Sequence, residues 1–221
     1  MRRFVLLAAI LLSASGRAQV AETVKPEPEP YELKGDRLGM SLVDFKARYF
    51  HVPARDPRPG PFCSDAYPGG FTRPTKRKDA AALDAVTEGT AVGLVTCKIF
   101  FPFEEREGPK STVANVPVVL LFDFVDGKLY KIQASFRQEV FDKMRTAFTE
   151  KYGEPNVGET KTYQNAFGAG FTGQSLLWNN GVSSILLLER AIDLKTSMLM
   201  FLHASLGKEA KARKPKPKPD L

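Results

Sequence analysis

The fold of this chain is decided by the stretch Val118-Val-Leu-Leu-Phe-Asp-Phe124, then Val125-Asp-Gly-Lys128, then Leu129-Tyr-Lys-Ile-Gln-Ala-Ser-Phe136. The first run is almost entirely apolar and the second alternates apolar with polar residues, and both patterns are typical of β-strands. Asp126-Gly127 between them is a dipeptide favoured in two-residue hairpin turns. The stretch therefore predicts an antiparallel hairpin, with its first strand central in a sheet that helices cover on one face.

Helices are expected on both sides of this hairpin. Apolar residues recur at helical spacing over residues 138–152, and Gly153 ends the pattern. Earlier in the chain, Ser41 and Asp44 form a capping-box pattern that predicts a helix over residues 42–50. A short helix is also expected over 79–86. Further strands are predicted over residues 31–38, 93–101, 175–178, 183–189 and 197–204, with a weaker, glycine-interrupted segment over 163–171.

The order of these elements predicts an α+β fold. A helix followed by about three strands occurs twice, and short hairpin connections favour an antiparallel sheet with helices packed on one face. The same order is compatible with two tandem helix-plus-three-strand units. We therefore expect one α+β domain over residues 31–207, which could divide into halves at 31–136 and 137–207.

The N-terminus has the pattern of a secretory signal peptide over residues 1–18. Arg2 and Arg3 precede the apolar run Phe4–Leu12, and small residues lead to Ala18. This apolar run is too short to span a bilayer, which needs about 20 apolar residues. We expect a periplasmic or secreted protein with no transmembrane segment after cleavage.

Two proline-rich arms flank the predicted domain. Residues 19–30 contain a Pro/Glu-rich spacer, and residues 208–221 form a basic Lys-Pro tail. In this tail Lys214, Lys216 and Lys218 alternate with proline. Two interpretations stay open for them: a solvated tail, or contact with an anionic polymer such as cell wall.

The net charge of +7 arises at the chain ends. Without the nine basic and two acidic residues of 1–18 and 208–221, the remaining chain carries 23 basic and 23 acidic residues. A phosphate-binding groove would give the body a basic excess. We therefore expect no nucleic-acid partner.

Cys63 and Cys97 are the only cysteines in the chain. An exported protein folds in an oxidising compartment, where an even number of cysteines is typical of disulfides. Zinc ligands, by contrast, come in closely spaced pairs. The sequence predicts a Cys63–Cys97 disulfide.

No motif predicts a catalytic residue, a cofactor site or a metal site. The segment Gly168–Gly173 fits G-x-G-x-x-G, but no helix pattern follows it, so a glycine-rich turn or bulge is expected. The two histidines, His51 and His203, keep one alternative open: a small secreted or periplasmic hydrolase with a His/carboxylate site. That alternative requires a deep pocket that holds an imidazole beside buried acids.

Three aromatic residues near the second half of the sheet have two interpretations. Tyr163, Phe171 and Trp178 could form an exposed interaction patch, because Trp and Tyr are enriched at interface centres. Packing in the core or on a sheet face is the favoured alternative. The sequence leaves both interpretations open.

Two motifs resemble a known superfamily. Leu38-Gly-Met-Ser-Leu-Val-Asp-Phe45 opens a helix after a spacer, and Lys151-Tyr-Gly-Glu-Pro155 closes one. Both are similar to motifs of the SmpA/OmlA-like and β-lactamase-inhibitor-protein-like superfamily of bacterial envelope proteins. The resemblance implies a tandem helix-plus-sheet arrangement and a protein-binding role.

The chain differs from the lipoprotein members of this superfamily because its first cysteine is Cys63. The matching positions are structural ones, so no functional residue is carried over. We expect a non-catalytic binding module that contacts an envelope protein or an anionic cell-wall polymer.

Overall fold

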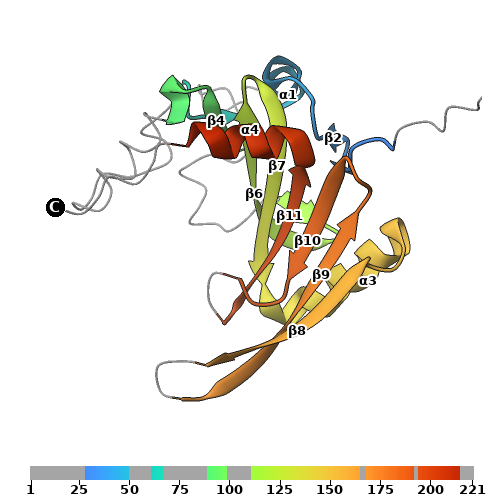
Figure 1. The fold of residues 1–221 in the computed structure, drawn as a ribbon. Coiled ribbons are helices and arrows are strands. Elements are labelled where there is room, and N and C mark those ends of the chain that lie inside the picture. The colour runs from blue at the N-terminus through green and yellow to red at the C-terminus, as the bar shows by residue number, and fades with distance from the viewer. Residues whose placement is uncertain are drawn as a thin grey trace, which may run out of the picture.

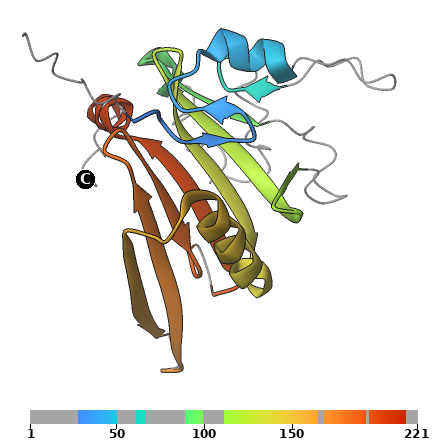
Figure 2. The ribbon, with the colours of Figure 1, turned by 90° about the vertical axis from the view of Figure 1, so that its right-hand side faces the viewer.

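The computed structural model of the chain (Figures 1 and 2) describes six segments. They are residues 28–49, 61–66, 89–98, 111–164, 168–191 and 194–214. The predicted signal peptide, the helix expected over 79–86, His51, Lys216 and Lys218 lie outside them.

A single antiparallel sheet of nine strands organises the described chain, in the order β3-β4-β6-β7-β11-β10-β9-β8 with β5 beside β6. The strands are β3 (Phe62–Cys63), β4 (Leu94–Lys98), β5 (Ser111–Val113), β6 (Val116–Val125), β7 (Lys128–Arg137), β8 (Val157–Gln164), β9 (Gly170–Asn179), β10 (Ser183–Leu188) and β11 (Thr196–His203). β7 and β11 pair over seven residues, so the sheet runs without a break across the boundary between 31–136 and 137–207.

The central hairpin confirms the prediction from sequence. Asp126 and Gly127 have φ angles of 44° and 70°, the left-handed conformation that a two-residue hairpin turn requires. A register shift at Asp123/Phe124 forms a bulge near this turn. The turn chemistry therefore fixes the pairing of β6 with β7.

The core lies on one face of the sheet. α1 (Leu42–Tyr49), α3 (Phe141–Tyr152) and the small β1–β2 hairpin (Glu32–Leu33 and Asp36–Arg37) cover this face, and Figure 2 shows α1 and α3 on the same side. The side chains beneath them form a row of register partners, each at most 1% exposed: Cys97, Phe122, Ile132, Phe201, Ile185 and Trp178. Burying a large apolar side chain stabilises a fold by roughly 1.5–3 kcal/mol. The predicted α+β class is confirmed.

Local signals in the sequence set the helix ends. The Asp44 N–H donates to Ser41 Oγ at 3.0 Å, so Ser41 caps the start of α1, and the Ser41 hydroxyl in turn donates to Asp44 Oδ2 at 2.7 Å. α3 ends at Gly153, which has a φ of 80° and donates its N–H to the Thr149 carbonyl. α3 begins three residues later than predicted, because the 3-10 turn η3 (Gln138–Val140) precedes it.

The structure differs from the sequence prediction at residues 31–38. They form β1 and β2 rather than one strand, because Lys34 and Gly35 adopt positive φ angles of 55° and 83° and turn the chain back. The β1–β2 hairpin then packs over the core through Leu33, which is 5% exposed.

A further difference is the helix α4 (Ala204–Arg213), which replaces the start of the predicted basic tail. α4 lies on the face of the sheet opposite α1 and α3 (Figure 2). Its buried Ala210 packs with Val125 and Tyr130, and Leu206 adds to this second cluster. Only Leu206 and Ala210 mark the apolar side of α4, so no clear helical pattern in the sequence predicts a docked helix.

The predicted disulfide is confirmed. Cys63 and Cys97 are register partners on β3 and β4, and both are fully buried. This bond fits a protein that folds outside the cytoplasm. Within the described segments, no helix combines the length and apolar character needed to cross a membrane.

Candidate binding face

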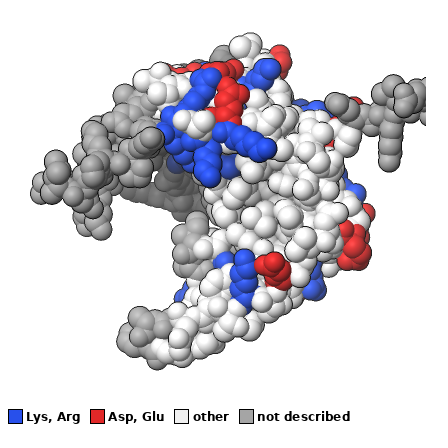
Figure 3. All heavy atoms as spheres, viewed as in Figure 1, with Lys and Arg blue, Asp and Glu red and all other residues white. Residues whose placement is uncertain are grey.

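The face of the sheet opposite the core carries a second row of side chains, apolar except for Gln133, which we call the apolar row. Its members are register partners on six adjacent strands: Leu121, Gln133, Met200, Leu186, Leu177 and Val157. Five are half-buried and Val157 is 45% exposed. Figure 3 shows this face as a broad, mostly uncharged surface over β9, β10 and β11.

The row arises because β10 and β11 are apolar at consecutive positions. Ile185 and Leu187 enter the core, while Leu186 and Leu188 point to the other face. An antiparallel strand with one solvated face normally alternates apolar with polar residues, whereas a continuous apolar run is typical of a strand covered on both faces. No described helix covers β9, β10 or the middle of β11 on this side. The sequence therefore supplies an apolar surface that the described chain leaves uncovered.

A buried polar cluster bounds the apolar row on the side of α4. Lys131 Nζ lies 2.5 Å from Asp123 Oδ2, and Thr96 Oγ1 donates to Asp123 Oδ1 at 2.6 Å. Asp123 is 8% exposed, so these bonds offset the unfavourable burial of its charge. Burial and then the nearby Asp123 carboxylate raise the pKa of Tyr130, which keeps this phenol protonated.

The α4 end of this face is basic. Figure 3 shows Lys and Arg side chains gathered over α4. Arg213 is held in place, because its guanidinium contacts both carboxylate oxygens of Asp126 and lies 2.8 Å from Glu209. Lys214, the one member of the predicted anionic-surface contact in the described chain, follows α4 directly and is exposed.

The β8–β9 hairpin forms an arm at the other end of the face. Residues 160–164 and 170–174 extend past β10, whose pairing with β9 starts at Ser175. Tyr163 and Phe171 are register partners on this arm, and the Arg190 guanidinium lies 5.8 Å from the Phe171 ring centre. The structure thus brings together two members of the predicted aromatic patch.

Trp178 does not join them. It is 1% exposed on the core face, and its indole N–H donates to the Gly153 carbonyl at 2.7 Å. Trp178 therefore anchors β9 to the end of α3 and packs in the core, which is one of the two interpretations that the sequence leaves open.

A polar cluster that the sequence did not indicate lies beside α1. The Arg48 guanidinium donates to the carbonyls of Lys34 and Gly35 at 2.6 and 3.1 Å, and its Nε lies 3.3 Å from Asp36 Oδ1. Tyr49 donates its hydroxyl to Asp36 Oδ2 at 2.5 Å. Burial raises the pKa of Asp36, although the Tyr49 hydrogen bond and the Arg48 charge act in the opposite direction. A hollow of about 250 Å³ adjoins the cluster. The cation of the cluster, Arg48, is already bound to the β1–β2 turn.

The hydrolase alternative requires an imidazole beside buried acids. His203 is half-buried, and its Nδ1 lies 3.3 Å from Ser205 Oγ. Burial and then the Lys128 charge lower the pKa of His203, which favours the neutral imidazole. None of the hydrogen bonds or ion pairs in the described chain joins a carboxylate to His203, so no observation favours this alternative.

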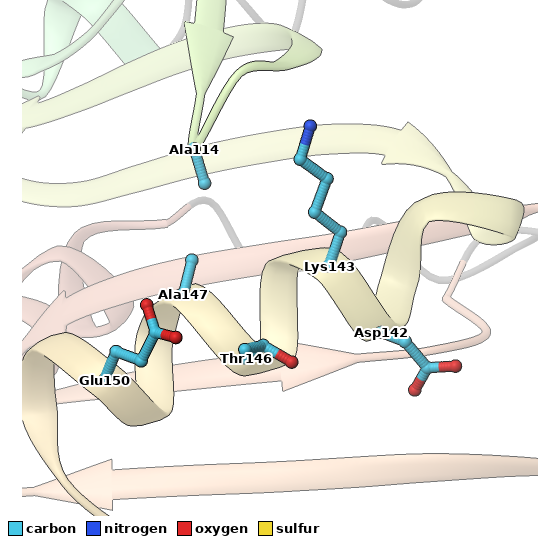
Figure 4. Close-up of a pocket in the computed structure, with 6 residues that line it drawn as sticks. All are labelled: Ala114, Asp142, Lys143, Thr146, Ala147 and Glu150. Atoms are coloured by element: carbon cyan, nitrogen blue, oxygen red, sulfur yellow. The ribbon is translucent and has the colours of Figure 1, made fainter.

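A shallow hollow of about 410 Å³ lies beside α3 (Figure 4). Its lining residues are Ala114, Asp142, Lys143, Thr146, Ala147 and Glu150. Figure 4 shows Ala114 and Ala147 facing each other, while the Asp142 and Glu150 side chains diverge. The described segments also contain no cluster of His, Cys, Asp and Glu suited to a metal ion.

Comparison with protein-family models, with curated proteins and with solved structures finds no match to this chain. The resemblance to the SmpA/OmlA-like and β-lactamase-inhibitor-protein-like superfamily therefore stays a prediction from two motifs. Only the geometry of this chain therefore supports the assignment of the candidate binding face.

Proposed function

We propose that the protein is a non-catalytic binding module that contacts another envelope protein through the apolar row. The observation that carries the proposal is the row itself: from Met200 to Val157 its side chains are apolar and in register on four adjacent strands, on a face that no described helix covers. Apolar and methionine side chains are typical of the centres of protein interfaces, where they become fully desolvated.

The surroundings of the row support a protein partner over a polyanion. A charged polymer would require cations along the whole row, whereas the cations beside it lie at its β4–β7 end: Lys98 is the register partner of Leu121, and Lys131 is paired with Asp123. The basic surface over α4 lies at the rim, where charge mainly guides the approach and orientation of a partner. A cell-wall polymer would instead bind through the α4 end and the Lys-Pro tail.

The location follows from two features. The predicted signal peptide leads to export, and the Cys63–Cys97 disulfide fits an oxidising compartment. We infer that the protein acts in the periplasm or after secretion.

The test compares variants in quantitative capture from an envelope extract of the source cells. Leu186→Gln and Met200→Gln each place an amide in the apolar row while leaving the core face intact. Val43→Gln, on the 75% exposed Val43 of α1, is the matched control on the opposite face. A partner that the wild type and Val43→Gln retain, and both row variants lose, supports the proposal. Equal recovery by all three variants, or a partner lost only on deleting the Lys-Pro tail, contradicts it.

A further inference from the structure

The free edge of β8 is a second surface, distinct from the apolar row. β8 is the last strand of the sheet and pairs only with β9 among the described strands. Seven of its eight residues are exposed, and none is proline. Natural proteins usually protect so long an edge, because its unpaired N–H and C=O groups are a template for another strand.

The hydrogen bonds of β9 show in which direction the backbone groups of β8 point. The Glu189 N–H donates to the Gln174 carbonyl, and the Gln174 N–H donates to Glu189 Oε2, each at 2.9 Å. Both backbone groups of Gln174 therefore point toward β10. Thr160 is the register partner of Gln174, and opposite residues in an antiparallel pair exchange both bonds or neither. Thr160 thus directs its N–H and C=O outward, as do Gly158 and Thr162 two positions away.

β8 of a second copy of the chain can form hydrogen bonds with these outward N–H and C=O groups in only a few registers. In an antiparallel two-fold pairing, outward-directed residues must lie opposite one another, so the axis can pass through Glu159, Thr160 or Lys161 near the middle of the strand. An axis at Glu159 or Lys161 places like charges directly opposite each other, which is destabilising. An axis at Thr160 avoids this repulsion.

The Thr160 register also creates favourable pairs. Glu159 lies opposite Lys161 of the second copy, and Val157 lies opposite Tyr163 of the second copy, each twice by symmetry. These are non-hydrogen-bonded pairs, in which Cα atoms approach to about 4.5 Å and side chains make their closest contacts. The three outward-directed residues meanwhile exchange about six backbone hydrogen bonds across the axis.

We propose that β8 pairs antiparallel with β8 of a second copy about a two-fold axis at Thr160, which joins two sheets into one. Glu159 and Lys161 now lie 3.5 Å apart within one strand, with side chains 57% and 55% exposed, so both are available to a partner. Pairing also places Val157, the end of the apolar row, within the dimer interface, opposite Tyr163 of the second copy. This inference is independent of the proposed function, because it involves the edge of the sheet rather than its face.

The experiment is analytical ultracentrifugation of the purified, disulfide-bonded protein up to millimolar concentration. The wild type is expected to show a reversible monomer–dimer equilibrium. Glu159→Lys or Lys161→Glu alone turns two attractive cross-strand pairs into repulsive ones and should weaken dimerisation by about tenfold or more. The double variant Glu159→Lys/Lys161→Glu restores opposite charges and should restore the dimer.

A backbone variant tests the edge itself. Thr160→Pro removes an N–H that points away from β9, so circular dichroism should show a folded monomer, while the matched control Thr160→Ala still dimerises. A wild type that stays monomeric at millimolar concentration overturns the proposal. So does a Thr160→Pro variant that dimerises like Thr160→Ala, or a charge-swapped double variant no better than the single ones.

Discussion

Replacing Trp178 tests the finding that this residue belongs to the core and not to an interaction patch. The Trp178→Phe variant retains a ring near Phe148, whose centre lies 6.2 Å from that of the indole. It loses the second ring of the indole and the 2.7 Å hydrogen bond to the Gly153 carbonyl. Trp178 is 1% exposed, so water does not fill the space directly.

The expected loss has two parts. A hydrogen bond contributes about 1 kcal/mol net, and Gly153 is exposed, so its carbonyl can regain a bond from water. The vacated volume in the core should remove about 1–2 kcal/mol more. We expect the free energy of unfolding to fall by about 2–3 kcal/mol.

The assay is urea unfolding followed by circular dichroism, because the variant has lost the only tryptophan of the chain. Leu177→Gln is the matched control: its side chain lies on the uncovered face, so we expect a loss below about 1 kcal/mol together with weaker partner capture. A Trp178→Phe variant as stable as wild type, or one that loses the partner while Leu177→Gln keeps it, would refute the assignment.

The remaining predictions concern stability. Reduction of the Cys63–Cys97 bond, which closes a loop with a sequence separation of 34, should lower the free energy of unfolding by about 3–4 kcal/mol in urea titrations with and without reductant. Ser41→Ala removes the cap of α1 and should destabilise the fold by about 1 kcal/mol, with Val43→Ala as a control. Asp36 has a pKa raised by burial, so the folded state binds its proton more tightly than the unfolded state. Its contribution to stability is therefore full at low pH and falls as pH rises through the folded pKa. The stability of wild type minus that of Asp36→Asn should decrease across the acidic range and level off above it; a difference that grows with pH would contradict this sign.

Local features of the fold could be predicted from the sequence because short-range chemistry sets them. Asp126-Gly127 specified the central hairpin, and the Ser41/Asp44 pair specified the start of α1. The order of the strands could not be predicted, because the pairing of β7 with β11 joins segments about 65 residues apart.

The candidate face was partly visible in the sequence. Consecutive apolar residues in 185–188 and 198–202 indicate that both faces of these strands are apolar, as they do for the first strand of the central hairpin. The position of Trp178 depended on register, because one residue separates the core face from the other face. The Asp36–Arg48–Tyr49 cluster depends on two positive φ angles in a short hairpin, which no pattern in the sequence indicated.

The central claim is that the uncovered sheet face binds a protein. A photo-crosslinking amino acid placed at Leu186, in intact cells of the source, tests it most directly, with the same group at Val43 as the comparison. We predict a discrete protein adduct from position 186 and none from position 43. An adduct from position 43 alone, or no protein adduct at 186 under conditions where the chain is exported and folded, would contradict the claim.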